Sequence, residues 1–394
     1  MKKYIALALA LIMALSCLTA CGSNTGDDPG DGSDAVLKSG DVSVTWDQFM
    51  YWLNGAANEL EGYYTSYSST GTFDWDDPCM FDTSISNAEW CVKRATQTVT
   101  ELCAIETYAN EKGITPSEED LEKLESFIGE YVTYYCGEDG TEEDFEREIL
   151  NPDFLTLDYY RQIFRTNLLY QGLFEDAYGA NGEKLSDEEA LAFADDGKYV
   201  TANHILLMTI DNEGNALDDA AIAEKRAKLQ SVADELKAIT DHDQLVAKFK
   251  EYKEELCEDT GKTYFPDGYC FTVGVMDSSF DTAARELEEY ALSELVQSVY
   301  GLHLILRLPN DPDAIVSDAS NSGSTLRSLA AADAFNDLVN DRIKATGCSF
   351  VGQYKDYDFT TLFGDEGFAG WLQSVPQESA APVESAAPEE GSAA

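Results

Sequence analysis

Two histidines lie in the middle of short apolar stretches that we expect to be β-strands. His204 lies in residues 199–208 and His303 lies in residues 301–308, and both stretches are rich in Leu and Ile. Side chains alternate across a strand, so His303 and Ile305 are predicted to share one face. The whole chain has three histidines. If the two strands pair in one sheet, two of these three imidazoles can meet on one face.

A second stretch with chemical potential lies between the histidines, at residues 265–287. Its pattern predicts a turn, a short strand and then a helix that begins near Asp277 or Ser278. Met276 and Phe280 are four residues apart, which would place them on one face of that helix. These two apolar side chains could therefore line one pocket.

Three motifs together resemble a parvulin-type peptidyl-prolyl isomerase. They are Ala-x-His-Ile-Leu-Leu from Ala202, Gly-x-Met-x-x-x-Phe-x-x-Ala-Ala from Gly274, and Tyr-Gly-x-His-x-Ile from Tyr300. They occur in the family's order within residues 198–309. The resemblance implies a small, mainly antiparallel sheet packed with helices.

The resemblance also implies the roles of individual residues. Met276 and Phe280 would seat the proline ring, with Phe271, Leu302 and the aromatic Tyr300 nearby as substrate-binding residues. His204 and His303 would be hydrogen-bonded at the floor of the pocket. For this histidine pair a catalytic role and a purely structural role both stay open.

Parvulins carry an Asp or a Cys near the pocket. Counting back from Met276 without gaps favours Asp259 as this catalytic residue, and Cys257 lies two positions away. The family's Gly-Asp-Leu-Gly turn is replaced here by residues 266–270, Pro-Asp-Gly-Tyr-Cys. We therefore expect a pocket with an altered rim.

Rotation about an X–Pro bond must cross a barrier of roughly 18–20 kcal/mol, mainly because amide resonance is lost. Such a reaction requires an apolar seat and the exclusion of water, so no cofactor and no metal is predicted. The loop 211–219 is acidic, which argues against recognition of phosphate. It also lacks the glycine and the final acid of a calcium-binding loop.

The region before the isomerase-like stretch is predicted to be helical. Helices are expected at residues 45–64, 89–112, 115–135, 141–149, 156–178 and 186–196, with a long loop at 65–88. The aromatics of that loop, Phe73, Trp75 and Phe81 among them, would pack on the domain's core or contact a client peptide. Thr45 and Gln48 form a predicted capping box.

This helical region, residues 35–197, resembles the N-terminal chaperone domain of extracytoplasmic foldases of the PrsA and SurA kind. The resemblance is carried by Val-Thr-Trp-x-x-Phe from Val44 and by the corner at residues 108–114. It implies that residues 310–374, with a helix at 326–345 and a strand at 348–351, pack back onto this domain. The predicted fold class is α+β, with an isomerase domain inserted into a helical domain.

The N-terminal segment is predicted to attach the protein to a membrane. Residues 1–20 read as a signal peptide, and Leu-Thr-Ala-Cys resembles a lipobox that would place lipid on Cys21. The alternative is a transmembrane anchor, but the apolar run is shorter than the roughly 20 residues that a spanning helix needs. Residues 21–34 are an expected tether and 375–394 an expected tail, both disordered. The protein would be held at the outer face of the cell membrane.

The composition restricts the partners. The chain has 26 basic and 74 acidic residues and a formal net charge of −48, so nucleic acid is excluded as a partner. Seven cysteines would remain after processing and lipidation, and none has the spacing of a zinc or redox motif. Their pairing and the oligomeric state stay open, and a homodimer is one option.

The preferred function is that of an isomerase and chaperone for unfolded, newly exported polypeptides with X–Pro bonds. A hydrolase is disfavoured because no Gly-x-Ser-x-Gly motif is present. A solute-binding lipoprotein would need alternating strands and helices along most of the chain. The remaining alternative is a peptide-binding holdase that has kept the fold without catalysis.

Overall fold

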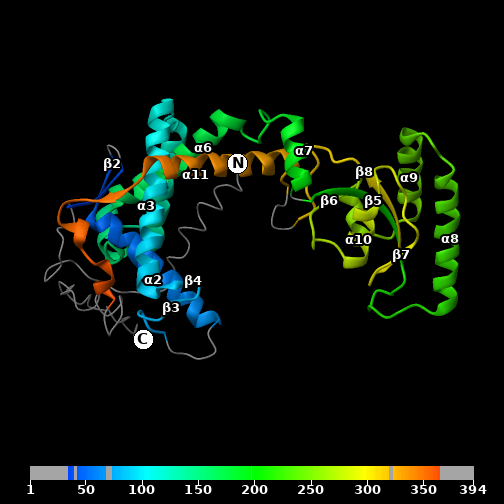
Figure 1. The fold of residues 1–394 in the computed structure, drawn as a ribbon, viewed down its shortest axis with the longest axis horizontal. Helices are drawn as coiled ribbons and strands as arrows, with labels where there is room; N and C mark the ends of the chain where they lie inside the picture. The colour runs from blue at the N-terminus through cyan, green and yellow to red at the C-terminus, as the bar shows by residue number, and fades with distance from the viewer. Residues whose placement is uncertain (1–33, 40–41, 68–72, 197, 319–322, 364–394) are drawn as a thin grey trace, which may run out of the picture. The chain divides into compact units, whose positions relative to one another are not determined.

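The computed structural model describes residues 34–39, 42–67, 73–196, 198–318 and 323–363 (Figure 1). The predicted signal peptide, Cys21, the tail and all of the tether except Asp34 lie outside these residues. No helix in the described ranges is long and apolar enough to span a membrane.

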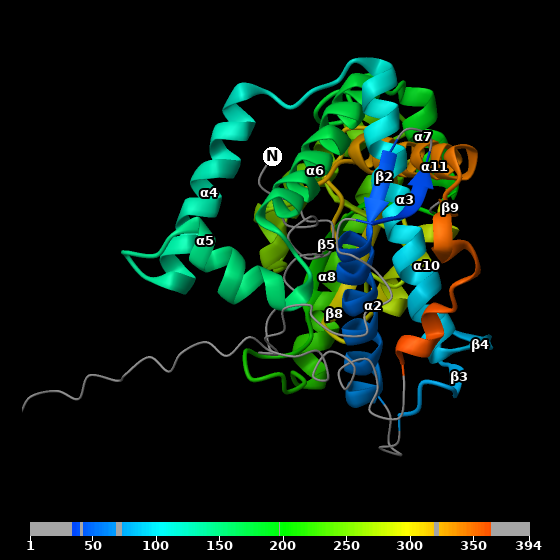
Figure 2. The same cartoon turned by 90° about the vertical axis from the view of Figure 1, so that its left-hand side faces the viewer.

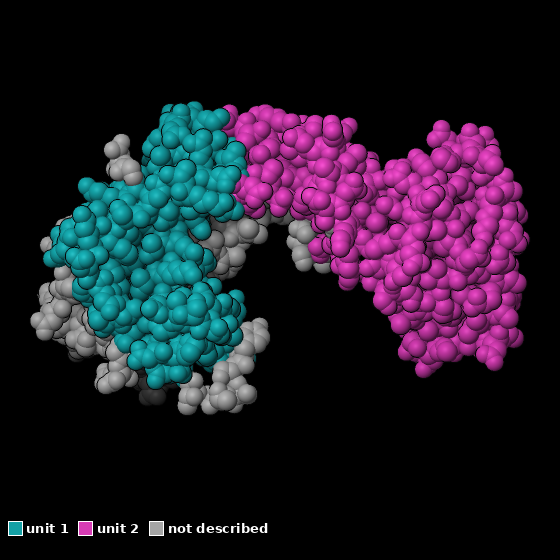
Figure 3. Space-filling model, viewed as in Figure 1, with its two compact units in different colours: residues 1–173, 338–394 teal, residues 174–337 magenta. Residues whose placement is uncertain are grey.

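The chain forms two compact units (Figure 3). Unit 1 comprises residues 1–173 and 338–394, and unit 2 comprises residues 174–337. The sequence placed the boundaries at 198 and 309 instead. They differ because helices on both sides of the sheet domain pack within unit 2: the Arg327 guanidinium donates to the Leu185 carbonyl and to Asp187, and the rings of Phe174 and Phe335 contact edge to face.

Unit 1 contains a three-stranded sheet that joins both ends of the chain. Its strands are β1 (Ala35–Ser39), β2 (Val42–Thr45) and β9 (Ser349–Phe350), in the antiparallel order β2-β1-β9. Helices α2 (Trp46–Tyr67) and α3 (Asn87–Lys112) pack against this sheet around buried Trp46 and Phe49. Short 3₁₀ turns at Gly352–Asp356 and Phe359–Leu362 complete the core with Tyr354 and Phe359.

The predicted start of α2 is confirmed, and the predicted long loop after it is wrong in part. The Thr45 N–H donates to Gln48 Oε1 at 3.0 Å, and the Gln48 N–H donates back to Thr45 Oγ1 at 3.4 Å. However, β3 (Pro78–Cys79) and β4 (Asp82–Ser86) form a hairpin before α3. The Asp82 carboxylate accepts hydrogen bonds from the N–H and the hydroxyl of Ser84, which stabilises the turn of this hairpin. Ser and Asp are common in loops as well as in such turns, so the sequence did not reveal the hairpin.

The remaining helices of unit 1 form a second cluster. They are α4 (Glu118–Cys136), α5 (Glu142–Phe145), a π turn at Glu146–Leu150, a 3₁₀ turn at Asn151–Asp153 and α6 (Leu157–Tyr178). Ser117 caps α4 by accepting the Asp120 N–H, so this helix begins after Pro116. Figure 2 shows α4 and α5 at the left of the view. Leu124, Ile128 and Val132 of α4 pack on Tyr160 of α6 and its neighbours.

Unit 2 contains the sheet that carries the histidines. Its elements are α7 (Asp187–Asp196), β5 (Val200–Met208), α8 (Asp219–Lys237), α9 (His242–Leu256), a 3₁₀ turn (Thr260–Thr263), β6 (Tyr269–Phe271), α10 (Ser278–Glu286), β7 (Val296–Gln297) and β8 (Gly301–Leu308). Helix α11 (Leu326–Thr346) follows and crosses into unit 1. The predicted strands at 199–208 and 301–308 and the predicted strand and helix within 265–287 are confirmed as β5, β8, β6 and α10, and the fold is α+β.

The four strands pair in the antiparallel order β6-β5-β8-β7, and helices cover both faces of the sheet. Ile205, Leu302 and Leu304 pack against α8 and α9 on one face. Ala202 and Ile305 pack against Phe280 of α10 on the other face (Figure 1). The alternation of side chains along β8 therefore sorts its residues between two cores, and His303 shares the parity of Ile305.

Candidate functional site

The structure brings His204 and His303 together at the centre of the unit 2 sheet. Leu206 is the register partner of His303, so the two histidines form a diagonal pair across β5 and β8. Their Nδ1 atoms are 3.0 Å apart, and the ring planes are nearly parallel at 16°. Both residues are buried, with 6% and 4% of their surface exposed. The sheet alone therefore suffices to fix this pair.

Asp259 holds the outer nitrogen of His204. Its Oδ2 lies 3.0 Å from His204 Nε2. The chain after α9 runs beside β5, where the Glu258 N–H donates to the Leu206 carbonyl at 2.8 Å and the Leu206 N–H donates to Cys257 Sγ at 3.3 Å. The two residues that the sequence left as alternatives thus have separate tasks. Asp259 contacts the imidazole, and Cys257 contacts the backbone that carries it.

Two further side chains extend the hydrogen-bonded line, and the sequence had not singled them out. The Tyr269 hydroxyl donates to Asp259 Oδ2 at 2.5 Å, and Ser298 Oγ lies 2.7 Å from His303 Nε2. Tyr269 shares a strand face with Phe271, which was a predicted site residue, so alternation along β6 could have revealed it. No comparable pattern marks Ser298, which lies in the turn that leads into β8.

The protons of this line follow from the partners. An ionised Asp259 only accepts, so His204 carries a proton on Nε2 and, as a neutral ring, accepts at Nδ1. His303 then donates from its Nδ1 and accepts at Nε2 from the Ser298 hydroxyl, whose oxygen receives the Tyr300 N–H at 3.1 Å. Every polar atom of the two rings has a partner while both rings stay neutral.

The surroundings shift the pKa values in the direction that this assignment needs. Burial alone would raise the pKa of Asp259, but hydrogen bonds from His204, Tyr269 and the Gly261 N–H outweigh it and hold the pKa well below its usual range. Burial, helped by the neighbouring His204, lowers the pKa of His303 to about 3. Burial and the bond to Asp259 raise the pKa of the Tyr269 hydroxyl. These shifts favour an ionised Asp259, a neutral His303 and a neutral Tyr269.

An aromatic wall lies against the histidines. The Phe280 ring centroid is 5.2 Å from that of His204 and 5.3 Å from that of His303, and Phe271 stands behind it at 5.8 Å. Phe280 is 3% exposed and Phe271 is fully buried, whereas Met276 is partly exposed and packs on the same cluster. The structure thus brings these three predicted residues together with the histidine pair.

Met276 does not reach this cluster by sharing a helix face with Phe280, as the sequence predicted. Helix α10 begins at Ser278, and Asp277 caps it by accepting the Ser279 and Phe280 N–H groups. Met276 lies before the cap in a loop that Asp281 holds by accepting the Gly274 N–H at 3.1 Å. The cap signal stands one residue after Met276, which is why spacing alone misplaced it.

The two remaining predicted residues are placed differently. Leu302 is fully buried on the opposite face of the sheet, among α8 and α9, and does not reach the histidines. Adjacent strand residues point to opposite faces, so its position next to His303 excludes it from the site. Tyr300 is 54% exposed at the turn before β8, and only its backbone N–H is joined to the line, through Ser298.

The altered turn at residues 266–270 has its own anchor, a buried lysine of α9. Lys253 has no exposed surface, and its Nζ donates to the carbonyls of Phe265 at 2.9 Å and Pro266 at 3.1 Å. Gly268 then takes a φ of 116°, and a Cβ there would lie 2.9 Å from the Ala202 carbonyl oxygen. Lys253 and Gly268 together direct Tyr269 towards Asp259.

No group of three or more His, Cys, Asp or Glu side chains that could hold a metal occurs within the described ranges. The acidic loop at 211–219 is closed by its own hydrogen bonds, since Asp211 Oδ1 accepts the N–H groups of Glu213 and Asn215.

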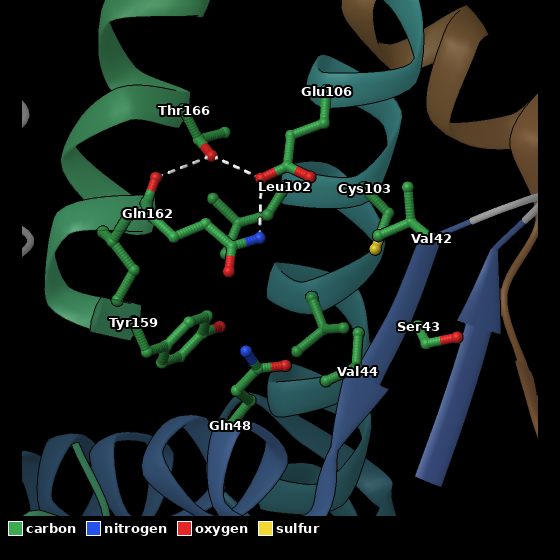
Figure 4. Close-up of a pocket in the computed structure, with 12 residues that line it drawn as sticks. Val42, Ser43, Val44, Gln48, Leu102, Cys103, Glu106, Tyr159, Gln162 and Thr166 are labelled. Atoms are coloured by element: carbon green, nitrogen blue, oxygen red, sulfur yellow. Dashed lines mark hydrogen bonds between the residues drawn. The ribbon is translucent and has the colours of Figure 1, made fainter. Parts of the chain in front are cut away.

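Unit 1 has a small cavity of about 20 Å³ that lies between α3, α6 and β2 (Figure 4). Glu106 accepts hydrogen bonds there from Gln162 Nε2 at 3.0 Å and Thr166 Oγ1 at 2.8 Å. This volume accommodates about one water molecule. The cavity is therefore part of the packing of unit 1.

Comparisons with known proteins give matches among solved structures only. No protein-family model matches the sequence, and no curated protein matches it. The chain is similar to PrsA from Bacillus subtilis, with 17% identity over 80% of this chain and 92% of that one and a TM-score of 0.22. It is similar to the peptidylprolyl isomerase PrsA from Bacillus cereus, with 14% identity over 82% and 96% and a TM-score of 0.27.

A shorter match falls on a single-domain protein. NmPin, the parvulin of Nitrosopumilus maritimus, has 23% identity over 28% of this chain and 96% of its own length, with a TM-score of 0.20. Identities and scores of this size leave the chemistry of the histidine site to be judged from its own residues.

Proposed function

We propose that unit 2 is a peptidyl-prolyl cis-trans isomerase of the parvulin type. The observation that carries this proposal is the hydrogen-bonded line Tyr269–Asp259–His204–His303–Ser298 beneath an apolar cluster of Met276, Phe280 and Phe271. It joins the three motifs that resemble the family into one site. The line does contain a hydroxyl beside an imidazole, but Ser298 is 7% exposed, its oxygen already receives the Tyr300 N–H, and the low pKa of His303 makes this ring a weak base. These features favour a structural role for Ser298 and fit a reaction that makes and breaks no covalent bond.

The site offers the physical requirements of amide rotation. The transition state has lost amide resonance, so the twisted bond is favoured where an apolar wall holds the proline ring and water is excluded. Met276 and Tyr269 are the partly exposed side chains of this cluster, so they would contact the substrate's proline ring. The buried Phe280 packs in the same cluster and supports them. The buried histidines keep this wall on a rigid and uncharged floor.

A second function has a specific observation in its favour. Phe280 and Phe271 are almost completely buried, and the turn that forms the rim differs from the family's pattern. Such a site has the surface to bind a peptide without the depth to enclose a proline. The alternative is a peptide-binding holdase that retains the parvulin fold.

The cellular role that we propose combines the N-terminal lipid anchor with this site. A lipid on Cys21 would hold the protein at the outer face of the membrane, and residues 21–34 would separate it from the bilayer. Its partners would be unfolded, newly exported polypeptides with X–Pro bonds, which unit 1 would hold while unit 2 isomerises them.

The decisive experiment is NMR exchange spectroscopy of a proline-containing tetrapeptide with purified chain lacking residues 1–21. We expect faster cis-trans exchange that the variant Met276→Ala removes. The matched control is Met80→Ala, because Met80 is 44% exposed in unit 1 and lies outside the site. Folded wild-type protein that leaves the exchange rate unchanged would contradict catalysis, and peptide binding without acceleration would favour the holdase.

A further inference from the structure

A surface of aromatic rings lies along α4 in unit 1 and shares no residue with the proposed isomerase site of unit 2. It comprises Phe127, Tyr131, Tyr134 and Tyr135, and we call it the α4 tyrosine surface. Tyr134 is 80% exposed and Tyr135 is 50% exposed. These values are high for rings of this size, which usually bury most of their surface. Tyr134 and Tyr135 are consecutive residues of one helix, so their exposed rings form a continuous surface on the described part of the chain.

The rings are ordered by contacts with one another. Tyr131 and Tyr135 stack with 5.8 Å between centroids and 9° between planes, and Phe127 meets Tyr131 edge to face at 4.6 Å. Tyr134 meets Tyr135 edge to face at 4.8 Å. Residues four apart share one face of a helix, so the stack follows from the spacing of Phe127, Tyr131 and Tyr135. A ligand would meet a surface that is already arranged.

An arginine braces the helix that carries these rings. Arg161 of α6 donates from Nε and Nη2 to the carboxylate of Glu125 on α4, at 2.9 to 3.1 Å, and also from Nη2 to Glu142 of α5. Its side chain is 25% exposed. A bidentate hydrogen bond between a guanidinium and a carboxylate fixes the orientation of the two side chains as well as the distance between them. Because the surface is held in place, less conformational entropy is lost when a partner binds.

The charge around the rings is strongly negative. From Glu118 to Glu148 the chain has thirteen acidic residues and two basic ones. Both basic side chains are already paired: Lys123 with Glu119 and Asp120, and Arg147 with Asp144 and Glu148. An anionic partner would be repelled here, and a cationic one would be attracted.

We propose that the α4 tyrosine surface binds cationic, Lys- or Arg-containing segments of unfolded polypeptides. The guanidinium or ammonium group would lie against the Tyr134 ring, which is 80% exposed, and beside the exposed part of Tyr135, whose ring stacks on Tyr131 and Phe145. The surrounding carboxylates would increase the local concentration of this group. Selection among unfolded chains would then depend on charge at unit 1 and on proline at unit 2. The proposal extends the proposed function to clients, but the binding does not require unit 2 to be catalytic.

The test uses the chain lacking residues 1–21 and a short unstructured peptide of Ala, Ser and Arg. Binding is followed by isothermal titration calorimetry at low and at physiological salt. Two matched peptides carry Gln or Glu in place of every Arg. We expect the Arg peptide to bind, added salt to weaken it and the Glu peptide not to bind. Equal affinity for the Arg and Gln peptides would overturn the proposal.

Protein variants locate the site. An exposed cation–π contact corresponds to roughly two- to fivefold in Kd per ring, so Tyr134→Ala with Tyr135→Ala should weaken binding about tenfold. Tyr134→Phe with Tyr135→Phe keeps the rings and should bind within about twofold of wild type. Tyr264→Ala, which removes an 81% exposed tyrosine of unit 2, is the control. Unchanged affinity in the double alanine variant would place the binding elsewhere and overturn the proposal.

Two parallel measurements separate this proposal from its rivals. The double alanine variant should accelerate, or fail to accelerate, tetrapeptide isomerisation to the same extent as wild type, so a failed isomerase assay leaves the peptide result intact. Sedimentation of the protein alone tests whether a second copy covers the rings. A dimer that dissociates on Tyr134→Ala with Tyr135→Ala would assign the surface to self-association and overturn the peptide proposal.

Discussion

At the scale of single residues, the unusual feature of unit 2 is a line of five hydrogen-bonded polar side chains, of which His204, His303 and Ser298 are buried and Asp259 and Tyr269 are partly buried. Asp259 receives two side-chain hydrogen bonds, from His204 and Tyr269. A buried polar network of this kind is favourable only if each member is satisfied. It explains why the site tolerates histidines that are more than nine-tenths buried.

The low pKa of His303 predicts a pH dependence of stability. The folded state keeps His303 neutral until about pH 3, while the unfolded state takes up a proton near the ordinary value of 6.5. Unit 2 should therefore lose stability as pH falls from about 6.5 towards 3, by roughly 1 kcal/mol per pH unit from this residue. Urea unfolding at several pH values between 6.5 and 5 measures the slope.

The variant His303→Asn identifies the source of that slope. It removes the titrating ring, so the slope in this pH window should become flatter than in wild type. His242→Asn removes a histidine of the same unit outside the hydrogen-bonded line and serves as the comparison. A His303→Asn protein with the wild-type slope would show that other groups are responsible.

A second prediction concerns Tyr269. Replacing it by Phe removes the hydroxyl that donates to the Asp259 carboxylate, which should destabilise unit 2 by about 1–2 kcal/mol. Chemical denaturation followed by the histidine ring protons measures the loss. Tyr264→Phe is the matched control because Tyr264 is 81% exposed, and its stability should stay within about 0.5 kcal/mol of wild type. Equal effects of both changes would deny the hydroxyl its role.

Residue spacing in the sequence revealed part of this line. Alternation in two histidine-bearing strands predicted that His204 and His303 could meet if the strands paired. The resemblance to parvulins, with counting back from Met276, favoured Asp259 as their neighbour. Ser298 could not be found, since its contact with His303 depends on how the turn after β7 folds back. Leu302 was assigned to the site wrongly. It is adjacent to His303 in β8, and alternation along a strand places adjacent side chains on opposite faces of the sheet.

At the scale of elements, helix α9 supports the altered turn through one buried cation. Removing water from an ammonium group is costly, and burial lowers the pKa of Lys253 accordingly. Two backbone carbonyls of the turn replace that water. The turn therefore depends on α9 for its shape, rather than on a run of glycines.

Lys253→Met should test this dependence. The loss of two charge-assisted hydrogen bonds predicts a destabilisation of about 1–3 kcal/mol, measured by urea unfolding. Lys250→Met is a close control on the same helix, because Lys250 contacts Asp267 of the same turn but both side chains are largely exposed. That change should cost less than about 1 kcal/mol. A Lys253→Met protein as stable as the control would refute the anchoring role.

Most helices could be predicted because their limits are marked by capping residues. Thr141 with Asp144 forms a capping box where the sequence predicted a helix start. Ser86 with Glu89 forms another, although the sequence analysis had left Ser86 in the loop before residue 89. The hairpin β3–β4 was missed because two-residue pairings leave little periodic signal. Met276 was misplaced because Asp277 is the N-cap of α10, so Met276 lies in the loop before the helix.

At the scale of the whole molecule, the two units can be observed separately. The four tryptophans in the described residues, Trp46, Trp52, Trp75 and Trp90, lie in unit 1, and all three histidines lie in unit 2. Tryptophan fluorescence therefore reports on unit 1 and histidine ring protons report on unit 2. We expect the two probes to show different urea midpoints, because the units have separate cores.

A shortened chain that ends at residue 346 sharpens this prediction. It lacks β9 and the aromatic residues Tyr354 and Phe359 that stack on Trp46. The fluorescence transition should shift to lower urea, while the histidine transition should stay close to its full-length midpoint. Equal shifts of both probes would mean that the units unfold as one.

The sheet that joins both ends of the chain has a consequence for synthesis. The Tyr354 hydroxyl donates to Asp34 across 320 residues of sequence, and β1 finds its partner β9 only near the end of the chain. Domains commonly fold in the order in which they emerge from the ribosome. Here unit 2 is complete at residue 337, before the last part of unit 1 exists. The core of unit 1 therefore stays incomplete until β9 has been synthesised, after every residue of unit 2.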